Sequence, residues 1–558
     1  MLEIAGEEAQ SMVMDHHGLV AAVCRDLGIA EKIDQRLGRD SQRVVSPGQA
    51  VVAMILNGLG FTNRRLYLTH QFFQTKPVEH LLGAPIKAED LTDYTLGHTL
   101  DQISKYGASE LFASVAFETA MEQNLLGMMN HLDSTSFSVH GEYEVKDDPK
   151  VIEITHGHSK DHRPDLKQVV LSLVVNGPSA MPIWMEPLDG KSSDKSSFHE
   201  TIKKMQAFQK QIHFKKDFKW VADSALYTAD KLLKSDYQWL TRVPETIKEA
   251  RGLVEKSDDT IDWKESSKGY KMAAFESSYG DVAQRWLLIF SEQAYQREKK
   301  TFDKRLKSEA VTLSKALWHL GNTIFGCETD ALSGLKVIEK KYSFHKISYE
   351  IVPVLKNIGC GRPKAGEQKT KLVGYKVAAS FTENTPAIEL RLNRKGRFIL
   401  ATNDLNTEEY PDSQMLLEYK DQQHVERGFR FLKDPWFMVD SIFLKLPHRV
   451  EALMMVMTLC LMVYNIAQYK LREALKKEDE TLPNQLGKPI QNPTLRWIFQ
   501  IMEGISLVQF YEKHIEKPVK EVIMNLNALR QKIIRFFGET ACLLYGLIVK
   551  NSVRGLGM

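Results

Sequence analysis

Cysteine is scarce in this sequence, and its cysteines stand far apart. The five are Cys24, Cys327, Cys360, Cys460 and Cys542. No two of them form a Cys-x2-Cys pair. Because zinc ribbons and disulfide frameworks are built from closely spaced pairs, both are excluded. We therefore expect a protein of a reducing compartment, the cytoplasm.

Long apolar runs are also lacking. The opening stretch "MLEIAGEEAQ" is acidic and has no apolar core, so we expect no signal peptide. The longest apolar run, from Ala452 to Ala467, is shorter than the roughly 20 residues that a membrane span needs. We interpret it as a buried helix and expect no membrane partner.

A charge excess of either sign is absent as well. The 558 residues include 74 basic and 71 acidic side chains, which leaves a formal net charge of +3. Bulk charge therefore cannot bring the chain to a polyanion, and any such site must come from local clustering. The length indicates several domains, and the composition is that of an ordinary globular protein.

Hydrophobic periodicity divides the chain into five parts. Helical spacing dominates from Gly18 to Leu126, and strand-like alternation begins at Met128. A region of mixed strands and one charged helix interrupts this α/β pattern. We predict a helical N-terminal domain (1–126), a mixed α/β core (127–244), an inserted, partly β domain (245–393), the rest of the core with a helix around Glu426 (394–446), and a helical C-terminal region (447–558).

The stretch "YKDQQHVERGFRFLKDP", residues 419–435, places a carboxylate among basic residues. At about 100° per residue, a helix here would gather one polar face within roughly 80°. That face would hold Tyr419, Gln422, Glu426, Arg430 and Lys433. A solvated face with i,i+4 ion pairs is the simpler interpretation, so other stretches must decide.

Two further carboxylates occupy strand positions. Asp133 lies in the strand-like "MMNHLDSTSFSVHG", and Asp223 ends the strand "KWVAD". Either alone is typical of a turn or cap. Together with Glu426 they would form an all-oxygen site suited to two Mg²⁺ or Mn²⁺ ions. The basic residues around Glu426 would then hold the phosphates of DNA.

At this point the sequence resembles the insertion-sequence transposases with an Asp-Asp-Glu triad. One branch of that family has the pattern Tyr-x2-Arg-x3-Glu-x6-Lys, which Tyr419, Glu426 and Lys433 match, whereas Gln422 stands in place of the arginine. The resemblance extends to "HLDSTSF", "VADSALY" and "GHSKDHRPDLKQ", and it covers roughly residues 90 to 450.

The resemblance implies an α/β fold: an RNase H-like mixed sheet core interrupted by a partly β insertion, with helical N- and C-terminal regions. It implies a cut-and-paste transposase whose catalytic and metal-binding residues are Asp133, Asp223 and Glu426. The expected partners are double-stranded DNA, as terminal inverted repeats and as target, and a second copy of the chain in a homodimer. The expected place of action is the nucleoid in the cytoplasm.

Eight residues are our candidates for DNA contacts. The helix around Glu426, the loop before Gln168 and the aromatic after Pro435 supply them. They are Tyr419, Gln422, Arg427, Arg430, Lys433, Lys160, Arg163 and Trp436. In the resembled branch a flipped base stacks on an aromatic side chain, for which Trp436 and Trp220 are candidates, although both are equally suited to a core.

Several patterns leave alternatives open. His156, His158 and His162 would offer a zinc pair if helical, although Gly157 and Pro164 favour a basic loop that faces DNA. The "GRP" triplet of residues 361–363 is typical of minor-groove hooks and also of ordinary basic loops. The arginines of "NRRLYL", residues 63–68, suit either DNA contacts or a helix bundle.

Two rival functions remain at this stage. A metal-dependent nuclease on the same core would cleave DNA without joining it. A domesticated DNA-binding protein would have lost catalysis, which the presence of Asp133, Asp223 and Glu426 disfavours.

Overall fold

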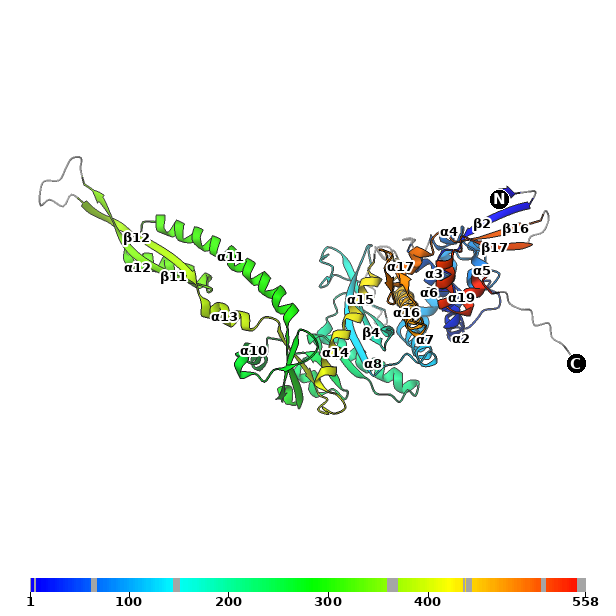
Figure 1. The fold of residues 1–558 in the computed structure, drawn as a ribbon, viewed down its shortest axis with the longest axis horizontal. Coiled ribbons are helices and arrows are strands. Elements are labelled where there is room, and N and C mark those ends of the chain that lie inside the picture. The colour runs from blue at the N-terminus through cyan, green and yellow to red at the C-terminus, as the bar shows by residue number, and fades with distance from the viewer. Residues whose placement is uncertain are drawn as a thin grey trace. The chain divides into compact units, whose positions relative to one another are not determined.

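In the computed structural model the chain forms two compact units (Figure 1). The first consists of Met1–Leu240 and Leu417–Met558, and the second, Thr241–Leu416, is inserted into it. The structure describes residues 2–4, 7–61, 68–143, 151–358, 370–434, 437, 444–512 and 518–548. The finer domain limits expected from periodicity stay predictions.

Helices follow one another in the N-terminal part of the first unit, as the apolar spacing indicates. The helix α3 (Pro47–Gly58) begins with a capping box, in which Ser46 Oγ accepts the Gln49 N–H and the Gln49 side chain accepts the Ser46 N–H. The other α-helices here are α1 (His17–Asp26), α2 (Ile29–Leu37), α4 (Thr69–Phe73), α5 (Val78–Leu82), α6 (Asp93–Tyr106) and α7 (Ala108–Glu122).

The core sheet of the first unit follows the strands that the alternation predicts. These strands are β3 (Met129–Val139), β4 (Lys167–Asn176), β5 (Met181–Leu188), β6 (Lys219–Ala222) and β7 (Trp239–Arg242). Their order in space is β5-β4-β3-β6-β7. The first three pair antiparallel, whereas β6 pairs parallel to β3. This mixed topology is that of an RNase H-like core.

Helices cover this sheet and position its central strands. The helices α7 and α16 (Pro447–Lys477) pack against β5, and α15 (Gln423–Leu432) packs against β3 and β4. α8 (Asp194–Gln211) and α9 (Ala229–Leu233) connect β5, β6 and β7 along the chain. By length and composition alone α16 could cross a membrane, but 83% of its most apolar window is buried inside the protein. The predicted buried helix is confirmed.

The C-terminal region is not wholly helical, which corrects the prediction. Besides α17 (Leu495–Ile501), α18 (Ala528–Phe536) and α19 (Glu539–Leu544), it contains β14 (Leu482–Pro483), β15 (Pro489–Ile490), β16 (Ser506–Tyr511) and β17 (Lys520–Met524). Two N-terminal strands, β1 (Leu2–Ile4) and β2 (Glu7–Val13), join the last two in a sheet of order β1-β2-β16-β17. Because β2 and β16 come from opposite ends of the chain, local periodicity did not reveal their pairing.

The inserted unit has strands of its own. Its antiparallel strands are β8 (Lys264–Glu265), β9 (Tyr270–Ser277), β10 (Gln284–Ser291) and β13 (Arg397–Thr402). A long hairpin is formed by β11 (His345–Asn357) and β12 (Thr370–Glu383). The helices are α10 (Lys248–Glu255), α11 (Glu292–Asn322), α12 (Glu328–Lys341) and α13 (Thr385–Asn393).

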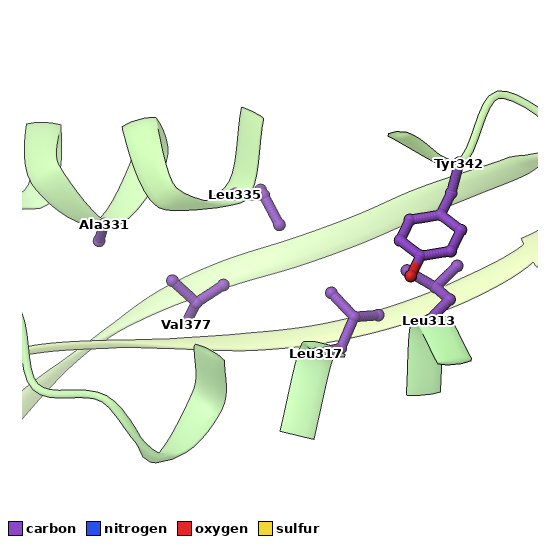
Figure 2. Packing of buried hydrophobic residues seen from close by; sticks show 6 residues of the cluster. All are labelled: Leu313, Leu317, Ala331, Leu335, Tyr342 and Val377. Carbon is purple, nitrogen blue, oxygen red and sulfur yellow. The ribbon is translucent and has the colours of Figure 1, made fainter. Parts of the chain in front are cut away.

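A separate hydrophobic core stabilises the hairpin end of this unit (Figure 2). Leu313 and Leu317 of α11 meet Ala331 and Leu335 of α12 and Val377 of β12, and all are buried. Removal of these apolar side chains from water is the main source of free energy that stabilises a core of this size. The charged helix α11 is thus amphipathic and anchored through one apolar face.

Candidate active site

Two aspartates meet at the centre of the core sheet. Leu132 of β3 pairs with Ala222 of β6 in parallel register, so the next residues along the two segments, Asp133 and Asp223, are neighbours. Asp133 still belongs to β3, whereas the Asp223 carboxylate caps the 3-10 helix Ser224–Leu226. The charge of Asp223 acts on Asp133, as their proximity requires.

These carboxylates are costly to ionise without a cation. The pKa of Asp133 is raised to about 7, chiefly by burial; Lys160 and the Ser134 N–H act to lower it, and Asp223 and Asp194 act to raise it. Burial also raises the pKa of Asp223. A positive charge beside such a pair stabilises its ionised form. The oxygen donors therefore fit Mg²⁺ or Mn²⁺, hard cations that prefer carboxylates.

A third carboxylate, Asp194, lies next to this pair and was missed by sequence reasoning. It is the first residue of α8, and it accepts hydrogen bonds from the Ser134 hydroxyl and, at 3.0 Å, from Lys160 Nζ. A lone aspartate at a helix start is also typical of a residue that complements the helix dipole, so no specific signal in the sequence marked Asp194.

The Lys160 ammonium lies among these carboxylates. Its Nζ donates to the Ser134 carbonyl at 2.7 Å and lies 4.0 Å from Asp133 Oδ1, besides its bond to Asp194. In this structure Lys160 thus acts as a counter-ion within the protein. Its predicted contact with DNA stays a prediction.

The helix that carries Glu426 is interrupted, which corrects the prediction of one continuous helix. α14 (Asp412–Asp421) ends just before Gln422, and α15 begins just after it. At the junction the Gln422 N–H bonds to the Tyr419 carbonyl, three residues back, at 3.2 Å. This tighter turn shifts Tyr419 relative to the face that a regular helix would give.

Glu426 is exposed on α15, which packs against β3 and β4. In the part of the chain that the structure describes, no three His, Cys, Asp or Glu side chains lie close enough to hold one metal ion. The convergence of Glu426 with Asp133 and Asp223 therefore stays a prediction.

Gln422 attaches this helical segment to the sheet. Its side chain is buried, and Nε2 donates to the Leu132 carbonyl of β3 at 2.8 Å, one residue before Asp133. His131, whose pKa burial lowers to about 4, lies beside it. The neutral Gln422 side chain can thus be buried while it bonds to the sheet. An arginine at this buried position would also need a partner for its permanent charge. The contact of Gln422 with DNA stays a prediction.

The other candidate DNA contacts differ in how far they are already paired. Lys433 Nζ binds Asp161 Oδ1 at 2.7 Å, and exposed Arg163 pairs with Asp165 through two hydrogen bonds. Exposed Arg427 donates to Gln423 at 2.8 Å. Arg430 is exposed, and Tyr419 is half-buried. Their roles toward DNA stay predictions.

The structure describes only one of the two tryptophans that are candidates for base stacking. Trp220 of β6 is buried and packs edge to face against Tyr237, with ring centroids 6.3 Å apart, so it is a core residue. Trp436 lies outside the described residues, as do the "GRP" triplet and Arg64 and Arg65.

The histidine stretch is not helical. Thr155 forms an isolated antiparallel bridge with Gln168, and no helix spans residues 156–162. Gly157 packs so tightly that a Cβ there would lie 2.0 Å from the Gly190 carbonyl oxygen. A zinc pair at helical i,i+4 spacing is therefore absent, and an extended loop is present instead.

No curated protein matches the chain. One similar solved structure is titled "Cryo-EM structure of piggyBac transposase synaptic complex with hairpin DNA (SNHP)"; it is 9% identical, with a TM-score of 0.34, over 89% of this chain and 82% of that one.

Family models match two segments. Residues 9–117 match a domain of unknown function, DUF4277. Residues 131–465 match the transposase DDE domain, and this segment is more than half of the chain and includes Asp133, Asp223 and Glu426. The chain therefore belongs to the transposase DDE domain family.

Proposed function

We propose that this protein is the cut-and-paste transposase of an insertion sequence, of the branch with the Tyr-Arg-Glu-Lys pattern. It binds the terminal inverted repeats of its element, cleaves them, and joins the 3′ ends to target DNA. The observation that carries the proposal is the register of β3 and β6, which brings Asp133 and Asp223 together within a transposase DDE domain.

In this proposal Asp133, Asp223 and Glu426 hold the catalytic ions. Two bound Mg²⁺ or Mn²⁺ ions would activate the attacking oxygen and stabilise the leaving oxygen at one phosphate. Gln422 positions α15 on β3. Arg430, on that helix, and Lys433, just after it, bind neighbouring phosphates. Burial raises the pKa of Asp133, so a cation bound there would stabilise its ionised form.

Two element ends must be held together for joining, so we propose a homodimer on DNA, acting at the nucleoid. Light scattering of the protein with and without end DNA measures this state. A complex with one protein copy for two ends would contradict the dimer.

A strand-transfer assay with precut ends tests the reaction. We expect joined products in Mg²⁺, and we expect Asp133→Asn and Asp223→Asn to lose at least about a hundredfold in rate, because charge at the reacting phosphate would no longer be neutralised. End binding should persist. Asp217→Asn, an exposed carboxylate just before β6, is the matched control and should keep activity.

The rivals give different outcomes in the same assay. Cleavage without joining would indicate a nuclease, and binding without either reaction would indicate a DNA-binding protein that has lost catalysis. Either result overturns the proposed transposase.

A further inference from the structure

A cavity of about 390 Å³ lies between α15 and α16, away from the aspartates described above. Its walls come from both helices, from Phe61, from the turn at Pro178–Ala180 and from residues 494–496, all within the first unit. This volume is typical of a small-molecule site and holds one nucleotide but no duplex.

The cavity has an excess of positive charge. Arg427, Arg430, Arg472 and Arg496 line it, and Asp434 is the one carboxylate among the described lining residues. Asp434 pairs with Arg496. Within the described part of the chain, the other three arginines have no carboxylate partner.

The hydrogen bonds of these arginines leave donors available. Arg427 donates to the Gln423 side chain, and Arg472 Nε donates to the Pro493 carbonyl at 2.9 Å. Burial lowers the pKa of Arg472, and the like charge of Arg427 also acts to lower it. Arg472 is partly buried, so an anion beside it would stabilise its charge, and the planar fork of a guanidinium group matches a phosphate.

Aromatic side chains form another part of the lining. The rings of Phe431 and Tyr464 lie 4.6 Å apart, and Phe61 is 6.2 Å from Phe431. Tyr469 also lines the cavity, as does His424, whose pKa is lowered by burial. Aromatic faces beside cationic groups are the elements that bind unpaired nucleotides.

A glycine fixes the approach of the two helices. At Gly428 a Cβ would lie 3.1 Å from Leu461 Cδ2 of α16, closer than ordinary contact, so the Leu461 side chain would have to shift. Across this helix contact the Phe431 ring of α15 packs against the Tyr464 ring of α16.

We infer that this cavity binds an unpaired nucleotide of a DNA strand, with its phosphate held by Arg427 and Arg472 and its base packed against Phe431 and Tyr464. The inference deepens the proposed function, because DNA would approach along the helix that carries Glu426. It requires neither metal ions nor catalysis.

Binding of a short single-stranded oligodeoxynucleotide, measured by fluorescence anisotropy in EDTA over a salt series, tests the inference. We expect Arg472→Gln and Arg427→Gln each to weaken binding about tenfold, and each to flatten the log–log salt slope by about 0.7, because one phosphate contact is lost. Arg535→Gln, an exposed arginine of α18, changes the same charge elsewhere and should leave both unchanged. Equal affinity in all variants overturns the inference.

Two further measurements identify the ligand and guard against misfolding. Photocrosslinking of a 5-iodouracil oligonucleotide to the unmodified protein should label Phe431 or Tyr464, and labelling elsewhere alone overturns the inference. Deoxythymidine monophosphate should compete only weakly, since a strand adds further contacts. If it binds as tightly as the oligonucleotide, the site takes free nucleotides and the commitment to DNA is wrong.

The outcome is separate from that of the strand-transfer assay. Loss of crosslinking with normal joining would contradict the cavity site and leave the transposase proposal intact. Crosslinking to the cavity without strand joining would contradict the transposase proposal and leave the cavity site intact.

Discussion

At the scale of single residues, Asp133 shows how burial makes a carboxylate dependent on its neighbours. The sequence placed Asp133 and Asp223 on strands of one sheet, and the parallel register of β3 and β6 agrees with that placement. Asp194 was not predictable, because the contact depends on how α8 begins relative to β3. Likewise, the counter-ion position of Lys160 depends on the path of an irregular loop.

The raised pKa of Asp133 predicts a pH dependence of stability. Because the folded pKa, about 7, is above the ordinary value of 3.8, the folded state binds the proton more tightly than the unfolded state. Without metal, this contribution to the free energy of unfolding is fully present below about pH 4 and is lost as the pH rises to about 7, by at most roughly 4 kcal/mol.

Thermal melting in EDTA at several pH values measures this effect. Asp133→Asn should melt higher than the parent above pH 7 and show a flatter profile between pH 4 and 7, whereas Asp217→Asn should follow the parent. Parallel profiles for parent and Asp133→Asn would contradict the assignment.

Lys160 gives a second prediction at this scale. Lys160→Met removes the cation beside Asp133 and Asp194, so the metal-free protein should lose more melting temperature at pH 8 than at pH 5, where fewer carboxylates are charged. At pH 8, Mg²⁺ should raise the melting temperature of Lys160→Met more than it raises that of the parent protein. A loss that is the same at both pH values would instead indicate lost packing.

At the scale of elements, periodicity predicted the core strands and the long helices, because each buries one face of regular structure. It did not predict the interruption between α14 and α15, since the buried amide of Gln422 is held by a carbonyl nearly 300 residues away. Strand β16 was missed for a similar reason, because it pairs with the remote β2, and β17 completes the sheet by pairing with β16.

The junction at Gln422 can be tested by substitution. Gln422→Ala leaves the Leu132 carbonyl without its donor, so the free energy of unfolding should fall by about 1–3 kcal/mol. Cleavage should fall more than end binding, since α15 would no longer be fixed to β3. Gln423→Ala, the exposed neighbour, is the control; a similar loss there would argue against a special role for Gln422.

At the scale of the whole molecule, the insertion carries its own hydrophobic core. Composition indicated a partly β insertion, but the pairing of α11 and α12 over the β11–β12 hairpin depends on contacts between distant segments. The helix α12 and the strands β8 and β9 were not predicted, because short amphipathic segments are ambiguous in sequence.

This separate core predicts local unfolding. Leu317→Ala should destabilise the insertion by about 2–5 kcal/mol, because it leaves a cavity in the cluster. Hydrogen exchange should then quicken in α11, α12, β11 and β12 while β3 and β4 keep their protection. Trp318→Ala, next in sequence and 66% exposed, should change little. Equal loss of protection in β3 would indicate one cooperative unit.

The sheet that joins both ends of the chain also sets an order of events during synthesis. Asp15, just after β2, accepts a hydrogen bond from the Gly504 N–H, 489 residues later. At ribosomal rates of about 5–20 residues per second, β2 waits roughly 25 to 100 s for β16 to emerge. Throughout that interval its edge is open to wrong partners. A chain released before β16 is made would keep that edge of β2 unpaired by β16.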